Sequence, residues 1–212
     1  MLKITNKMTM KKLILCLLVL PAVCFLTACG KSDDDIDGDT MVTLNASNLT
    51  EDGYFDGIMY YKITSNFPRQ VAVAKVLKSA VSIEIPTIIN IEGSNYTCTS
   101  IGDRAFYECY ELTLVTIPNS ITSIGYDAFA FCQGLTSVCL PNSMASIADG
   151  AFRRCSGLTT IYCKNTIPPS QPWYGVFEDY IYDKATLYIP KGSRKAYRSA
   201  YGWYRFANVV EE

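Results

Sequence analysis

The sequence contains no histidine in its 212 residues. Histidine is the commonest general acid and base in enzymes, and it completes the usual serine and cysteine catalytic triads. Its absence excludes those mechanisms, so we expect a protein that is not an enzyme.

Clustered metal-binding motifs are also lacking. The chain has nine cysteines, but the equivalent cysteines of its repeated segment, Cys109, Cys132 and Cys155, stand 23 residues apart. One cysteine per repeat does not provide the close tetrahedral grouping of a CxxC knuckle. We therefore expect no metal site and no cofactor.

Internal repetition is what the sequence does have. Three similar segments of 23 residues begin at Ile101, Ile124 and Ile147 and extend to residue 169. A period of this length is typical of a solenoid, in which one copy alone buries too little apolar surface to fold and stacked copies form a continuous core. The expected fold class is α/β and rich in strands.

The spacing of the apolar residues changes halfway through each copy. The first half has apolar residues at i, i+1, i+4 and i+7, which predicts a short helix, and the second half alternates, which predicts a strand ended by Pro118 or Pro141. Equivalent phenylalanines should then stack into one internal column, and equivalent cysteines into a ladder of buried free thiols. The expected column contains Phe106, Phe129 and Phe152, and the thiol ladder contains Cys109, Cys132 and Cys155.

Three aspartates stand near the start of these expected helices: Asp103, Asp127 and Asp149. A carboxylate in that position can accept backbone N–H bonds, so we interpret them as helix caps. The alternatives are a calcium-binding edge or the carboxylate pair of a glycosidase.

The pattern I-G-x-x-A-F-x-x-C-x-x-L-T-x-V-x-I-P-N-S resembles the BspA-type leucine-rich repeat over about residues 93–210. The resemblance implies a right-handed solenoid of about four 23-residue rungs with an N-terminal β cap and a C-terminal helical cap. A fourth, degenerate copy matches at Val176-Phe177 and at Leu187-Tyr188-Ile189-Pro190, with a two-residue insertion and no cysteine. The resemblance also implies adhesion as a function.

The N-terminus has the features of a bacterial export signal. Lys11 and Lys12 precede an apolar run over residues 13–28 that is short for a membrane span. The following Leu26-Thr27-Ala28-Cys29-Gly30 resembles a lipobox, which implies lipidation of Cys29, and the alternative is an ordinary cleaved signal. Loss of residues 1–28 removes four lysines and no acidic residue, which leaves a net charge of −5 and disfavours nucleic acid as a partner.

The acidic run over residues 31–39 should form a disordered tether. It also resembles the signal that sends lipoproteins to the outer face of the outer membrane, with a periplasm-facing lipoprotein as the alternative. Asp39-Thr40-Met41 resembles an acceptor for O-glycosylation. The expected domain organisation is a signal peptide (1–28), a lipidated acidic tether (29–52), an N-terminal β cap (53–92), the repeats (93–169), and a degenerate repeat with the C-terminal cap (170–212).

Strands within the β cap are expected at residues 57–64, 70–76 and 81–89, which are rich in β-branched and aromatic residues. Among the remaining cysteines, Cys98 and Cys163 align with inward positions, and Cys139 aligns with outward ones and should be an exposed thiol. Trp203, in the C-terminal tail, should be a core residue.

Outward strand positions form the candidate binding face, which is uncharged and increasingly aromatic toward the C-terminus. Aromatic rings with hydroxyl neighbours suit sugars or protein hot spots. Trp173 and Tyr174 lie beside this face and equally suit packing in the cap. The full set is Leu114, Thr116, Ser137, Cys139, Thr160, Tyr162, Trp173, Tyr174, Thr186 and Tyr188.

These observations predict a noncatalytic cell-surface lipoprotein that binds a protein or a glycan and contacts the membrane only through its lipid. The alternatives are a structural or assembly component of an outer-membrane complex and, ranked last, a glycan-degrading enzyme. The sequence does not indicate an oligomeric state.

Overall fold

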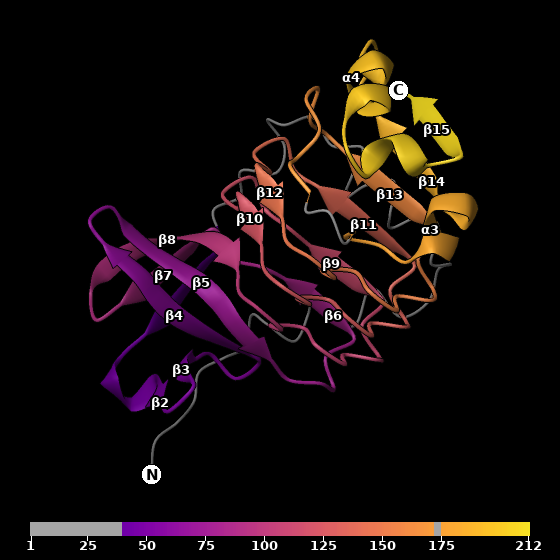
Figure 1. Ribbon diagram of the computed structural model, residues 1–212. Coiled ribbons are helices and arrows are strands. Elements are labelled where there is room, and N and C mark those ends of the chain that lie inside the picture. The colour runs from indigo at the N-terminus through magenta and orange to yellow at the C-terminus, as the bar shows by residue number, and fades with distance from the viewer. Residues whose placement is uncertain (1–39, 172–174) are drawn as a thin grey trace. The chain divides into compact units, whose positions relative to one another are not determined.

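The computed structural model describes residues 40–171 and 175–212, which are mostly strands and turns (Figure 1). Several predictions from the sequence lie outside these described residues. They are the signal peptide, the lipidation site Cys29, the acidic run up to residue 39, and the candidate binding residues Trp173 and Tyr174.

The N-terminal part is a mixed sheet with the strand order β1-β7-β8-β5-β4-β3-β2. Its longest strands follow the apolar and β-branched runs of the sequence, and Tyr61 and Val73 are fully buried in its core. The strands are β1 (Met41–Leu44), β2 (Leu49–Thr50), β3 (Gly53–Phe55), β4 (Met59–Asn66), β5 (Arg69–Val76), β7 (Ile88–Ile91) and β8 (Ser94–Ile101), and a 3-10 helix, η2 (Ala46–Asn48), precedes β2.

The strands expected at residues 57–64 and 70–76 are present as β4 and β5. The run at 81–89 contains two separate strands, β6 (Ser82–Glu84) and β7, because Pro86 cannot donate a ladder hydrogen bond. The segment 29–52, expected to be a tether, contains β1, η2 and β2. In β1, Leu44 is 2% exposed in the core, and Val42 packs against that core.

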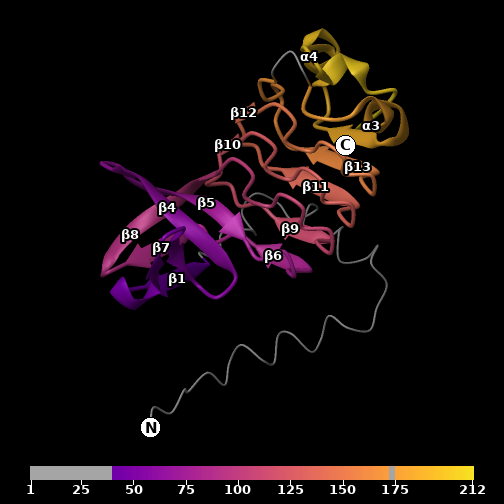
Figure 2. The same cartoon turned by 60° about the horizontal axis from the view of Figure 1, so that its bottom comes forward.

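The repeats form a second, parallel arrangement of strands stacked in chain order (Figure 2). β6 pairs with β9 (Leu114–Thr116), and the next copies contribute a four-stranded sheet in the order β11-β13-β14-β15. This second sheet consists of β11 (Ser137–Leu140), β13 (Thr160–Cys163), β14 (Thr186–Ile189) and β15 (Asn208–Glu211).

A row of very short strands connects the repeats to the N-terminal sheet. The end of β8 pairs in parallel with β10 (Ser123–Ile124), which pairs with β12 (Ser146–Ile147). Because β8 is also hydrogen-bonded to β5 and β7, the backbone ladder continues from the N-terminal sheet into the repeats.

The short helices expected within residues 101–169 are absent, and that prediction is wrong. Arg104, Glu108 and Asp127 have φ angles of 56°, 60° and 51°, in the left-handed region that a right-handed helix cannot contain. Backbone donors bond to the next copy instead of to their own turn. The nitrogen of Phe106 donates to Ala128 O at 2.7 Å, and that of Phe129 donates to Ala151 O at 2.8 Å.

The phenylalanine column is confirmed. Phe106, Phe129 and Phe152 stack with ring centroids 4.5 and 5.1 Å apart, and Phe177 of the degenerate copy extends the column at 5.4 Å. All three equivalent phenylalanines are fully buried. One continuous core therefore runs through the repeats.

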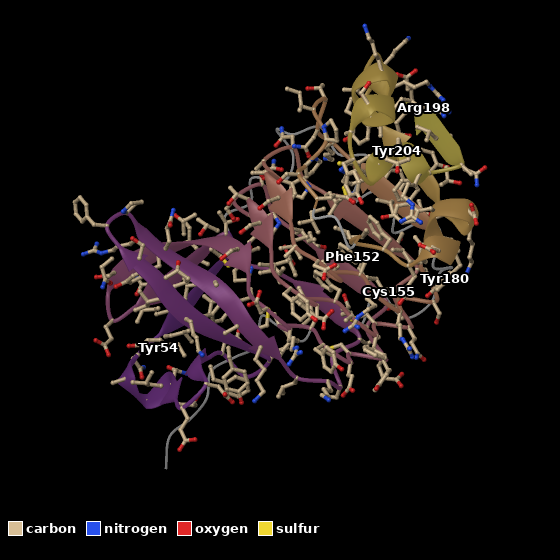
Figure 3. All side chains as sticks on the ribbon, viewed as in Figure 1. Tyr54, Phe152, Cys155, Tyr180, Arg198 and Tyr204 are labelled. Carbon is tan, nitrogen blue, oxygen red and sulfur yellow. The ribbon has the colours of Figure 1, made fainter. Side chains whose placement is uncertain are left out.

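The thiol ladder is also confirmed. The three equivalent cysteines are free and buried. The thiols of the later two donate to the preceding copy, with Cys132 Sγ 3.1 Å from Phe106 O and Cys155 Sγ 3.1 Å from Phe129 O. Phe152 and Cys155 both lie among the repeat strands (Figure 3). Cys98 and Cys163 are buried and free, as their register predicted.

The C-terminal segment adds the short helices α3 (Asp179–Lys184) and α4 (Arg194–Ser199) and the 3-10 helix η3 (Trp203–Arg205) around β14 and β15. Trp203 is 1% exposed, and its Nε1 donates to Pro169 O at 2.8 Å, which confirms it as a core residue. Within the described residues, no helix is long and apolar enough to cross a membrane.

Candidate functional site

The outward positions of the repeat sheet form a continuous surface, which we call the strand strip. The parallel register sets Cys139 beside Tyr162 and Tyr162 beside Tyr188, while Ser137, Thr160 and Thr186 form a second row. Thr116 is the equivalent residue of β9. The structure therefore brings together all the described candidate residues of the predicted binding face.

Two of these residues differ from the prediction. Ser137 is only 5% exposed, because its short side chain lies between those of neighbouring strands, with Thr160 directly beside it. Cys139 is half-buried and disulfide-bonded, so the expectation of a free, exposed thiol there is wrong. The other described members of the strand strip are half-buried, as side chains on the open face of a pleated sheet should be.

The aromatic part of the strand strip is a stacked pair. The rings of Tyr162 and Tyr188 have centroids 4.7 Å apart and an interplanar angle of 21°. Partial burial raises the pKa of Tyr162, with smaller contributions from Tyr188 and Glu212. The two rings therefore offer a rigid apolar surface with hydroxyl groups at its edge.

Sequence reasoning missed the residues at both ends of the strip. Glu84 of β6 lies beside Thr116, and Val210 of β15 lies beside Tyr188. Val210 is 40% exposed. β6 precedes the copies that the 23-residue period revealed, and β15 follows the last one. The pairing of β6 with β9 and of β15 with β14 therefore assigns these residues to the strip.

The three aspartates do not cap helices. Asp103 Oδ1 accepts a hydrogen bond from the backbone nitrogen of Tyr126 in the next copy at 2.7 Å. Asp127 is 1% exposed, and its Oδ2 accepts from Arg153 Nη2 at 2.7 Å. Both carboxylates thus connect one copy to the next.

A polar hollow of about 310 Å³ lies on the turn side of the repeats and is rich in carboxylates. Two of its carboxylates are held by arginines, since Asp127 pairs with Arg153 and Asp179 Oδ1 lies 2.6 Å from Arg205 Nη2. Asp149 and Glu178 complete the acidic lining. Among the described residues, no group of three or more histidine, cysteine or acidic side chains is arranged to hold a metal ion.

Comparison with solved structures identifies leucine-rich repeat proteins. One, from Bacteroides capillosus, is 27% identical with a TM-score of 0.53, and the match covers 66% of this chain and 99% of that one. A leucine-rich repeat protein of T. pallidum is 22% identical (TM-score 0.47; 66% and 65% covered). A leucine rich cell surface protein of Faecalibacterium prausnitzii is 23% identical (TM-score 0.48), and the match covers 68% of this chain and 46% of that one.

No curated protein matches the chain significantly. The family model of the BspA type leucine-rich repeat region matches residues 82–190 in six copies, which is just over half of the chain. The match begins at β6, whereas the first copy found from the 23-residue period begins at Ile101. The chain therefore belongs to the BspA-type leucine-rich repeat family.

Proposed function

We propose that this protein is a noncatalytic cell-surface protein that binds a protein or a glycan through the strand strip. The observation that carries the proposal is the stacked pair of Tyr162 and Tyr188, flanked by the hydroxyls of Thr160 and Thr186. Flat aromatic surface next to hydroxyl groups suits the apolar face and the polar edge of a sugar ring, and it equally suits a protein hot spot.

The rigidity of the strip supports a binding role. β11, β13, β14 and β15 are held by parallel backbone pairing on a core of fully buried side chains. Side chains on such a framework lose little conformational entropy when a ligand binds. The strip is short, so we expect modest affinity from one molecule and stronger attachment from many copies on one cell.

The proposed location rests on the sequence. The lipobox at residues 26–30 supports lipidation of Cys29, and the acidic run behind it supports an outer-membrane location that faces the exterior. Replacing Cys29 by serine should release the chain from the membrane fraction. Protease treatment of intact cells should remove the wild-type chain, whereas protection until lysis would favour the alternative role in assembling a complex of the same cell.

The enzymatic alternative requires a pair of carboxylates in one cleft. Such a pair would belong in the acidic hollow, where Asp127 and Asp179 are already engaged by Arg153 and Arg205. This arrangement supports a structural use of these two carboxylates.

The binding role is tested with the full chain on an array of glycans and purified extracellular matrix proteins. Tyr188→Ala removes one ring of the stacked pair and should weaken any hit about tenfold, as expected for an aromatic anchor. Tyr204→Ala is the matched control, because Tyr204 is 52% exposed and lies in the C-terminal segment (Figure 3). Equal loss in both variants, or no hit for the wild type, would contradict the proposal.

A further inference from the structure

A second hollow, of about 390 Å³, lies between the end of β5 and the start of the first repeat. One wall comes from β4, β5 and the residues after β5, and the other from the first turn of the repeat, residues 103–107. Two backbone hydrogen bonds fix the walls to each other: Val76 N donates to Ala105 O, and Gly102 N donates to Val73 O, each at 2.8 Å. The hollow is thus a preformed feature of the fold.

Cations outnumber carboxylates in this lining, and we call it the basic hollow. It contains Lys62, Lys75, Lys78 and Arg104, against Asp52 and Asp103. Within the described part of the chain, Lys62 has no ion-pair partner. The chain as a whole has a net charge of −1, so this positive lining is a local property.

Both carboxylates of the lining already have partners. Asp52 Oδ2 lies 2.6 Å from Lys75 Nζ. Asp103 Oδ1 accepts the backbone N–H of Tyr126. Two of the cations are engaged as well, since Lys75 pairs with Asp52 and Lys78 Nζ lies 2.5 Å from Glu108 Oε2. The charge of Lys62 remains for a ligand.

Arg104 is held in place by aromatic rings. Its guanidinium carbon lies 5.7 Å from the ring centroid of Tyr107 and 5.6 Å from that of Tyr126. The Nε of Arg104 lies 3.9 Å from Asp127 Oδ2, and stacking leaves the two Nη groups at the edge of the guanidinium plane to bind a ligand carboxylate. Leu77, Ala74 and the Tyr107 ring add apolar surface to the same hollow.

We propose that the basic hollow binds a saccharide that carries a carboxylate, such as a uronic acid unit. The carboxylate would lie between Lys62 and Arg104, and the apolar face of the sugar ring would pack on Tyr107. The volume suits one or two sugar rings, since small-ligand sites span roughly 300 to 1,000 Å³. An extended acidic peptide fits less well, because β5 is paired on both edges, by β4 and by β8, and offers no free strand edge.

The site is separate from the strand strip, so the two proposals can fail independently. The test is isothermal titration of the full chain with trigalacturonate and with a neutral galactose trisaccharide. We expect the acidic sugar to bind at least about tenfold more tightly, and its affinity to fall when the salt concentration rises from about 50 to 300 mM. Equal binding of the two sugars would overturn the proposal.

Variants locate the site. Lys62→Ala and Arg104→Gln should each weaken binding of trigalacturonate about threefold to fivefold. Arg69→Ala is the matched control, because Arg69 is an exposed cation at the start of β5 outside the lining, and it should leave affinity unchanged. If Arg69→Ala weakens binding of trigalacturonate as much as Lys62→Ala does, the attraction is unspecific. If Tyr188→Ala weakens it, the sugar binds on the strand strip. Equally tight binding of a hexa-aspartate peptide would overturn the assignment to a saccharide.

Discussion

The carboxylate of Asp127 lies 2.7 Å from Nη2 of Arg153, which stands on the next copy of the repeat. Asp127 is 1% exposed, whereas the side chain of Arg153 is 43% exposed. A buried carboxylate that loses its partner retains the full cost of desolvation. This ion pair therefore ties two copies together.

Removing the arginine should destabilise the fold. Arg153→Met should lower the free energy of unfolding by about 2 kcal/mol, less than for a fully buried pair because Arg153 is partly solvated and Arg104 approaches the same oxygen. Urea titration measures the change. Arg154→Met is the control, since Arg154 lies over the ring of Phe131, 5.3 Å from its centroid, and does not pair with Asp127; it should cost under about 0.5 kcal/mol. Similar losses in both variants would contradict a special role for Asp127.

Gly150 has no room for a side chain. A Cβ atom there would lie 2.4 Å from Asp127 Oδ1, and the residue has a φ of +65°. We expect Gly150→Ala to cost about 2 to 4 kcal/mol, from both the collision and the backbone strain. Gly192→Ala isolates the strain, because Gly192 has a φ of +84° with open space around it, and it should cost about 1 kcal/mol. Urea titration of both variants makes the comparison, and equal costs would mean that the carboxylate simply moves aside.

The phenylalanine column predicts that position along the solenoid determines the cost of truncation. Phe129 stacks on a ring at each side, at 4.5 and 5.1 Å, whereas Phe106 is the first ring of the column. Phe129→Ala should therefore cost about 3 to 5 kcal/mol and lower the melting temperature more than Phe106→Ala. Calorimetry of the two variants decides the order, and a reversed order would contradict the stacking.

The buried thiols predict chemical inertness. Burial raises the pKa of Cys109 and of Cys163 to about 11, so almost no thiolate forms at pH 8 in the folded protein. Ellman's reagent should leave all five free cysteines of the described residues unreacted until urea is added. Fast reaction of Cys109, Cys132 or Cys155 in the native protein would show that the ladder is open to solvent.

The same thiols predict a loss of stability in alkali. Their folded pKa exceeds the unfolded value of 9.0, so stability is fully present below pH 9 and falls as the pH rises toward 11. Urea titrations at about pH 8 and pH 10 should show this decrease. Cys109→Ala should reduce the decrease, and an unchanged or higher stability at pH 10 would contradict the sign.

Local periodicity predicted the strands well and the helices wrongly. Residues 114–116 and 138–140 alternate between half-buried and buried side chains, as expected for an extended backbone with one buried face. The spacing of Ala105, Phe106 and Cys109 fits a helix, but it also fits a series of turns. These residues face the core from a series of turns, because backbone bonds to the next copy replace bonds within a helix.

The sequence by itself determined the solenoid, its phenylalanine and cysteine columns and its family, because a repeated pattern can bury its apolar residues only when copies stack. Tertiary structure alone decided the ends of the strand strip, the ion pair of Asp127 with Arg153, and the basic hollow. The ion pair depends on the side chains that successive copies carry at positions where the repeat pattern sets no residue. The C-terminal end of the strip and the basic hollow join segments that are distant in sequence, such as Val210 with Tyr188 or Lys62 with Arg104. Such neighbours follow from strand pairing between distant segments, which local periodicity does not encode.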